Sequence, residues 1–285
     1  MTAPRATRAA ALLLLTALLA SAQSRFASYA GGRVHYESYG DGPEALVFIH
    51  GWTCDLTFWR AQAPVYENRR SLLIDLPGHG ASDKPDIAYP LEFFARGVEA
   101  AMRDAGVERA VLVGHSLGGP IAYTFLRLFP DQVKAIVLVD AGVTVPLDTA
   151  AYRSAQAARY AANRKALAGA PGVKYFAARI EAMFSRNTTP ELRDRIRSRM
   201  LAAPEYVRIA AVSSPSQLDP PKPGETYAIP VLSIQPTPSG PDTRTASLRK
   251  TFPGVKVENW IGAGHFLMME SPDRFNRSLN AFVSR

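Results

Sequence analysis

The sequence predicts an α/β fold in which a mostly parallel, doubly wound sheet carries an inserted helical lid. Short apolar runs alternate with helical patterns, which implies parallel strands joined by right-handed crossovers. The central runs, such as ALVFIH (45–50) and VLSIQ (231–235), are almost entirely apolar, as is typical of strands covered by helices on both faces. A long stretch without a strand pattern, residues 144–229, predicts a helical cap rather than a loop.

The expected strands and helices follow one another in a regular order. The predicted strands are residues 33–39, 45–50, 71–76, 109–114, 135–140, 231–235 and 255–261. The predicted helices of the core are residues 56–68, 91–105, 117–129, 243–252 and 272–283. Each helix opens with a cap or breaker, as where Ser271 and Pro272 precede the last one. We therefore expect the sheet domain to comprise residues 23–143 and 230–285.

Residues 1–22 have the pattern of a secretory signal peptide. Arg5 and Arg8 precede an apolar run over residues 9–19, and the small residues ASA follow. This pattern predicts cleavage near Ala22–Gln23 and a periplasmic or secreted mature chain. An uncleaved N-terminal anchor is the alternative. No later stretch is long and apolar enough for a stable membrane span after processing.

Composition excludes several classes of protein. Cys54 is the only cysteine of the 285 residues, so stability is expected from a buried core rather than from an internal disulfide. The net charge is +8, to which Arg5 and Arg8 contribute. The basic residues do not alternate with aromatic ones, so we expect no binding of nucleic acid. The arginines between 153 and 199 are more simply explained as the solvent-exposed face of helices than as a nucleic-acid-binding surface.

The stretch LVGHSLGGPIA (112–122) carries the first sign of chemistry. Ser116 stands between two glycines, after a predicted strand and before a predicted helix. In open α/β sheets, ligand sites gather at the carboxyl ends of the strands. A G-x-S-x-G run at such an end forms a strained elbow that exposes the serine hydroxyl. Ser116 is therefore a candidate nucleophile rather than only a helix cap.

A serine nucleophile needs a base within hydrogen-bond reach and donors for the negative charge that develops. His265, in GAGHFLMMESP, follows the last predicted strand and is the best placed of the five histidines. The backbone N–H of Leu117, directly after the serine, is one candidate oxyanion donor. Trp52, in the HGW turn after the strand at 45–50, is the other. The remaining histidines are His35, His50, His79 and His115.

The motifs FIHGW, DLPGHGASD, GHSLGG and GAGHF resemble, in order and approximate spacing, those of the α/β-hydrolase superfamily. The resemblance covers nearly all of the mature chain, and residues 144–228 match the variable cap. It implies Ser116 as nucleophile, His265 as base, and Trp52 and Leu117 as oxyanion donors. The motif DLPGHGASD has a structural role in the family, so Asp75, His79 and Asp83 are not catalytic candidates.

The third member of the implied triad has two candidates. Family order places the acid between the serine and the histidine, usually in the loop after the strand at 231–235. This chain has PTPSGPD there, with Asp242 a few residues late. The other position known in the superfamily is the end of the preceding strand, which falls on Asp140 in VLVDAG. We favour Asp140 because it ends a rigid strand, and keep Asp242 as the alternative.

The sequence thus predicts an exported serine hydrolase that cleaves small-molecule carboxylic esters, or related acyl bonds, through an acyl-enzyme. A serine at the elbow excludes the branches of the superfamily that use aspartate as nucleophile. No metal cluster and no dinucleotide motif occurs, so no metal and no cofactor is expected. Two alternatives stay open, because fold alone does not fix function. One is a cofactor-independent oxygenase or lyase on the same fold, and the other is a non-catalytic binding protein.

Overall fold

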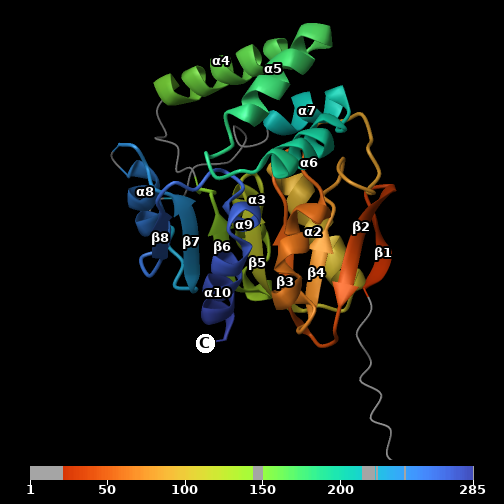
Figure 1. Cartoon of the computed structure of the whole chain (residues 1–285). Coiled ribbons are helices and arrows are strands. Elements are labelled where there is room, and N and C mark those ends of the chain that lie inside the picture. Colours follow the sequence, from red (N-terminus) through yellow and green to blue (C-terminus); the bar gives the residue numbers. More distant parts are fainter. Residues whose placement is uncertain (1–21, 144–149, 214–221, 223, 241, 285) are drawn as a thin grey trace, which may run out of the picture.

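The computed structural model describes residues 22–143, 150–213, 222, 224–240 and 242–284. Eight strands form one sheet in the order β1-β2-β4-β3-β5-β6-β7-β8 (Figure 1). The strands are β1 (Gln23–Tyr29), β2 (Gly32–Tyr39), β3 (Glu44–Ile49), β4 (Ser71–Ile74), β5 (Arg109–His115), β6 (Val133–Val139), β7 (Val231–Pro236) and β8 (Lys256–Trp260). The first 21 residues, which hold nearly all of the expected signal peptide, lie outside the described residues.

The predicted fold class is confirmed. β4, β3, β5, β6, β7 and β8 run parallel. β2 pairs antiparallel with β4, and β1 pairs antiparallel with β2 at the edge of the sheet. The central strands are buried along almost their whole length, which explains their apolar sequences. β1 is not among the strands predicted from the sequence. Its residues Gln23–Tyr29 are mostly exposed, so they carry little of the hydrophobic pattern of a strand.

Helices cover both faces of the sheet, as its apolar strands require. α2 (Leu91–Asp104) and α3 (Gly118–Leu128) pack together on one face. α10 (Pro272–Val283) lies on the other face with α1 (Ala63–Tyr66) (Figure 1). The further short elements are η1 (Leu56–Gln62), η2 (Pro130–Gln132), α8 (Thr243–Thr251) and α9 (Leu267–Glu270). The helix expected at 56–68 is therefore η1 followed by α1.

A helical insert lies between β6 and β7 in the chain and above one end of the sheet (Figure 1). It consists of α4 (Ala150–Leu167), α5 (Gly169–Glu181), α6 (Pro190–Leu201) and α7 (Glu205–Val212). Its inner faces bury apolar side chains such as Phe176, Ile196 and Val207. We call these four helices the cap. Because the insert follows the last residue of β6, the cap stands over the carboxyl end of the parallel strands. None of the helices in the described part of the chain combines the length and the hydropathy needed to cross a bilayer.

Candidate active site

Ser116 occupies the sharp turn between β5 and α3. Its φ angle is +52°, in the left-handed region that is costly for any residue but glycine. The turn is held by the N–H of Ser116, which donates to the carbonyl of Val139 in β6 at 3.0 Å. The carbonyl of Ser116 accepts from the N–H of Gly119, also at 3.0 Å. The side chain is half-buried, as expected for a strained elbow that presents its hydroxyl.

Three glycines make this elbow possible, because neighbouring atoms fill the space that their side chains would need. A Cβ atom on Gly114 would lie 2.4 Å from the carbonyl oxygen of Gly118. A Cβ on Gly118 would lie 2.3 Å from the carbonyl oxygen of Ile49. A Cβ on Gly119 would meet the Cβ of Ala141 at 2.4 Å. The glycines of GHSLGG therefore set how closely β5, α3 and the neighbouring strands approach.

Asp140 and His265 lie side by side. Oδ2 of Asp140 is 2.5 Å from Nδ1 of His265. Asp140 directly follows β6 and has a φ of +40°, and its N–H donates to the carbonyl of Ile234 in β7 at 2.8 Å. Two adjacent strands thus fix the backbone from which the carboxylate projects. The side chains are only 11% and 21% exposed, so solvent screens this contact weakly.

Arg244, which the sequence analysis did not single out, contacts the other carboxylate oxygen of Asp140. Its Nη1 lies 2.5 Å from Oδ1. A Cβ on Gly142 would approach Cγ of Arg244 to 3.2 Å, so the small residue leaves room for the arginine stem. Burial by itself would raise the pKa of Asp140. The hydrogen bond with His265 and the charges of His265 and Arg244 outweigh burial and hold the pKa well below its usual range.

Asp242, the alternative acid, has a different place. It is the N-cap of α8, and its Oδ1 accepts from the N–H of Thr245 at 2.9 Å. Its Oδ2 lies 3.4 Å from Nε2 of Gln235. No contact between Asp242 and His265 occurs among the described residues. The structure therefore brings His265 together with Asp140 and not with Asp242, whose carboxylate satisfies the free N–H of a helix end.

The backbone of His265 is held by His115 and by the cap. Nε2 of His115 donates to the carbonyl of His265 at 2.9 Å, since only a protonated ring nitrogen donates to a carbonyl. The N–H of His265 donates to the carbonyl of Met183 at 2.9 Å. Burial, and the nearby charge of His265, lower the pKa of His115 to about 3. His115 is therefore a neutral, buried donor that positions the loop.

Glu270 also ties this loop to the cap. One carboxylate oxygen accepts from the N–H of Gly264 at 2.7 Å. The other accepts from Oγ1 of Thr188 at 2.5 Å and from the N–H of Ser185 at 3.4 Å. The sequence offered no signal for this role beyond the position of Glu270 in the same short motif as His265.

The two candidate oxyanion donors lie on either side of the elbow. Leu117 is the residue before the first turn of α3. Trp52 follows Gly51, whose Cβ position is only 3.1 Å from the Cβ of Ser116, so the HGW turn runs directly against the serine. Neither the N–H of Trp52 nor that of Leu117 has a hydrogen-bond acceptor among the described residues. Both donors are thus free to bind an oxygen atom.

The side chain of Trp52 points into the cap. Its Nε1 donates to the carbonyl of Arg208 at 3.0 Å, and its ring lies 4.9 Å from that of Phe176. The guanidinium of Arg179 covers the indole, with 5.3 Å between its Cζ and the ring centroid. The cap therefore fixes the turn that carries this backbone N–H.

Asp75 of DLPGHGASD joins several segments near the end of β4. Oδ1 of Asp75 accepts from the N–H of Leu56 at 2.8 Å, and Oδ2 from that of Ala81 at 2.9 Å. Oδ2 also contacts Nδ1 of His35 at 2.7 Å. These bonds join β2, β4 and the start of η1. No group of three or more His, Cys, Asp and Glu side chains within the described ranges is placed to hold a metal ion.

The comparisons with known proteins agree with this fold. The family described as alpha/beta hydrolase fold matches residues 44–272. An uncharacterized protein of Mycobacterium tuberculosis is 36% identical over 119 residues, 41% of this chain and 35% of that protein. The dihydrolipoyllysine-residue acetyltransferase component of the acetoin cleaving system of Cupriavidus necator is 36% identical over 121 residues, 42% of this chain and 32% of that protein. The chain thus spans about a third of the length of these curated relatives.

Solved structures share the fold over nearly the whole chain. A thermophilic esterase from Thermogutta terrifontis superposes with a TM-score of 0.75 at 23% identity, covering 92% of this chain and 98% of that one. An esterase from Exiguobacterium antarcticum gives 0.76 at 19% identity, with 92% of this chain and 100% of that one covered. At such identities the likeness concerns the fold. The family match, which includes Ser116, Asp140 and His265, shows that the chain belongs to the alpha/beta hydrolase fold family.

Proposed function

We propose that this protein is an exported serine hydrolase that cleaves carboxylic esters of small molecules through an acyl-enzyme. The observation that carries the proposal is the contact between Asp140 and His265, whose ring lies 4.7 Å from that of His115, the residue before the strained Ser116. A carboxylate that accepts from Nδ1–H leaves Nε2 of the imidazole as a base. The esterases among the structural neighbours support an ester as substrate.

In the proposed reaction, Oγ of Ser116 attacks the carbonyl carbon of the ester while Nε2 of His265 takes the hydroxyl proton. The resulting oxyanion accepts from the N–H groups of Trp52 and Leu117. The tetrahedral intermediate then expels the alkoxide, which takes the proton from His265. Water, deprotonated by the same imidazole, attacks the acyl-serine and releases the carboxylic acid. The Asp140 carboxylate stabilises the imidazolium that forms in each half-reaction.

Labelling with a fluorophosphonate tests the proposal, because only an activated serine displaces the fluoride at a useful rate. We expect one label on the wild-type protein, on Ser116, and none on Ser116→Ala. Ser28→Ala is the matched control, since Ser28 is an exposed serine in β1, and it should be labelled like the wild type. His265→Ala should abolish labelling as well.

The same experiment separates the alternatives. A non-catalytic binding protein would show no label on Ser116 and no ester hydrolysis. A cofactor-independent oxygenase or lyase would use His265 as a base without forming an acyl-serine, so its turnover would survive Ser116→Ala. Ester hydrolysis that falls by several orders of magnitude in both Ser116→Ala and His265→Ala is the outcome that the acyl-enzyme requires.

Export is a separate part of the proposal and rests on the pattern of residues 1–22. N-terminal sequencing of protein recovered from the periplasm or medium should begin at or near Gln23. Met1 or Thr2 on a membrane-bound product would instead support the uncleaved anchor.

A further inference from the structure

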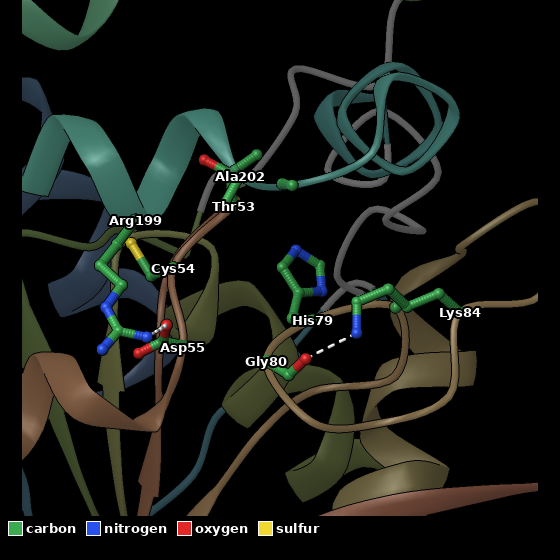
Figure 2. Close-up of a pocket in the computed structure, with 10 residues that line it drawn as sticks. Thr53, Cys54, Asp55, His79, Gly80, Lys84, Arg199 and Ala202 are labelled. Atoms are coloured by element: carbon green, nitrogen blue, oxygen red, sulfur yellow. Dashed lines mark hydrogen bonds and ion pairs between the residues drawn. The ribbon is translucent and has the colours of Figure 1, made fainter.

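A cavity of about 170 Å³ lies between the cap and the turns that follow β3 and β4. Thr53 and Cys54 lie on one side of the cavity, where Arg199 of α6 reaches down to Asp55, which also lines it (Figure 2). Lys84 lies on the opposite side, His79 stands between the two sides, and Ala202 lies above. The cavity lies next to the HGW turn, and this position is what relates the cavity to the candidate active site. The volume is enough for a small polar group and one or more waters, since a water in the liquid takes roughly 30 Å³.

The cavity wall carries one positive charge that no carboxylate neutralises. Nζ of Lys84 donates to the carbonyls of Gly80 at 2.6 Å and Ser82 at 3.0 Å. No carboxylate lies within ion-pair distance of Nζ in the described part of the chain. Arg199 has a partner, because its Nη1 lies 3.5 Å from Oδ2 of Asp55. An ammonium has three donors, so Lys84 keeps one hydrogen for a ligand.

His79 offers a buried acceptor in the same cavity. Its Nδ1 lies 3.0 Å from the carbonyl of Pro77, to which it donates, so the lone pair is on Nε2. Nε2 is buried and has no partner among the described protein atoms. Figure 2 shows the ring standing up from its turn toward the cap. Burial lowers the pKa of His79 to about 3, so the ring is neutral.

The lining of the cavity begins one residue after an expected oxyanion donor. Thr53 directly follows Trp52, one of the two expected oxyanion donors, and Gly51 packs against Ser116. Two residues of chain span at most roughly 7 Å. A group bound in the cavity can therefore belong to the acyl part of an ester whose carbonyl oxygen is held by the N–H of Trp52.

We propose that this cavity binds the carboxylate of an organic acid, with Lys84 as the charged donor; the charge of Arg199 on the other side is balanced by Asp55. A water bound with the carboxylate donates to Nε2 of His79. The carboxylate is either the far end of the acyl group of the ester or that of a free dicarboxylic acid. In its first form the inference rests on the proposed function and makes the enzyme selective for monoesters of dicarboxylic acids.

Two substrates of matched length test the first form. For monoethyl glutarate and ethyl pentanoate, acid release at constant pH gives the ratio of kcat/KM between the anionic and the neutral ester. We expect the wild type to favour the anionic ester and Lys84→Gln to lower this ratio about 10- to 100-fold, as for the loss of a charged hydrogen bond. Arg199→Gln should lower it less. Lys256→Gln, which alters an exposed lysine of β8, should leave the ratio at the wild-type value.

Calorimetry with glutarate on the Ser116→Ala protein tests the second form and does not depend on ester hydrolysis. Suppose that glutarate binds saturably, that Lys84→Gln weakens this binding at least tenfold, and that the wild-type enzyme shows no preference for the anionic ester. The cavity is then a site for a free dicarboxylic acid. A wild type that shows neither glutarate binding nor a preference for the anionic ester overturns the inference. So does an equal effect of Lys84→Gln and Lys256→Gln. Hydrolysis of neither ester, together with glutarate binding, would contradict the proposed function and keep the carboxylate site.

Discussion

The Nδ1 atom of His265 lies 2.5 Å from Oδ2 of Asp140, the residue that directly follows β6. The carboxylate that faces the histidine therefore comes from β6 and not from the loop after β7, where the family usually carries it. At the end of that loop Asp242 caps α8, and Arg244 in the first turn of α8 contacts Oδ1 of Asp140. This part of the chain therefore supplies a positive charge next to the acid and does not supply the acid.

Asp140→Asn should lower kcat for ester hydrolysis by roughly three to four powers of ten. The amide keeps the shape of the carboxylate but removes the charge that stabilises the imidazolium, and it permits the wrong tautomer of His265. Asp242→Asn should lower kcat by about tenfold or less. Steady-state kinetics at saturating ester checks both values. A large loss in Asp242→Asn with little loss in Asp140→Asn would show that the loop after β7 supplies the working acid.

Arg244→Gln should reduce kcat/KM by roughly three- to tenfold, because the arginine orients one oxygen of Asp140 through a partly exposed contact. Removing its charge also makes protonation of the Asp140–His265 pair easier. The acidic limb of the kcat/KM profile should therefore move to higher pH. In the described part of the chain, His265 and Arg244 are the charged groups that lower the pKa of Asp140, and the neutral ring of His115 lies beside His265.

Arg244→Lys should restore most of the wild-type pH profile, since it returns the charge. Arg249→Gln changes an exposed arginine of the same helix and serves as the control. Equal pH profiles for the wild type, Arg244→Gln and Arg249→Gln would show that the Arg244 contact has no influence on the pair.

The sequence predicts those parts of the site that are encoded by short stretches of neighbouring residues, namely the elbow and the loop of His265. The run GHSLGG predicts the elbow because a strand pattern precedes it and a helix pattern follows it. The order of the motifs is enough to place His265 at the carboxyl end of the sheet. The choice of Asp140 over Asp242 follows from the rigidity of a strand end, and the contact with His265 agrees with that preference.

The remaining contacts of the site join residues far apart in the chain. Arg244 and Asp140 are 104 residues apart, and His115 and His265 are 150 apart. No local period or propensity encodes such pairs, which depend on strand order and on how loops pack. The edge strand β1 was missed for a different reason: a strand with one neighbour and a mostly solvated surface needs few apolar residues.

Gly118→Ala should destabilise the fold by about 1–3 kcal/mol, because the new methyl group would meet the carbonyl oxygen of Ile49 at 2.3 Å and backbone must move. Gly119→Ala would meet the Cβ of Ala141 at 2.4 Å and Cδ2 of Leu138 at 3.3 Å, and should cost a similar amount because the Cβ of an alanine moves only with its backbone. Gly254→Ala is the control, since nothing lies within 4 Å of its Cβ position. Urea unfolding curves give the three values. A Gly118→Ala protein as stable as Gly254→Ala would contradict the close approach of α3 and β3.

The protein should lose stability as the pH falls below about 6.5, because three buried histidines are held neutral in the fold. Burial lowers the pKa of His50, and lowers those of His79 and His115 to about 3. The unfolded chain takes up protons at these positions near pH 6.5 while the folded chain does not. The free energy of unfolding therefore decreases with falling pH, by up to about 1.4 kcal/mol per pH unit for each histidine.

His115→Gln isolates one of these protons, since its amide nitrogen keeps a donor for the carbonyl of His265. Urea unfolding of the wild type and His115→Gln at pH 7.5, 6.0 and 5.0 measures the difference, above the range in which most carboxylates titrate. Between pH 6.0 and 5.0 the wild type should lose about 1 kcal/mol more than the variant, whatever their stabilities at pH 7.5. Parallel losses in the two proteins would mean that His115 takes up a proton in the folded state, and therefore that the donor behind His265 is not a neutral imidazole.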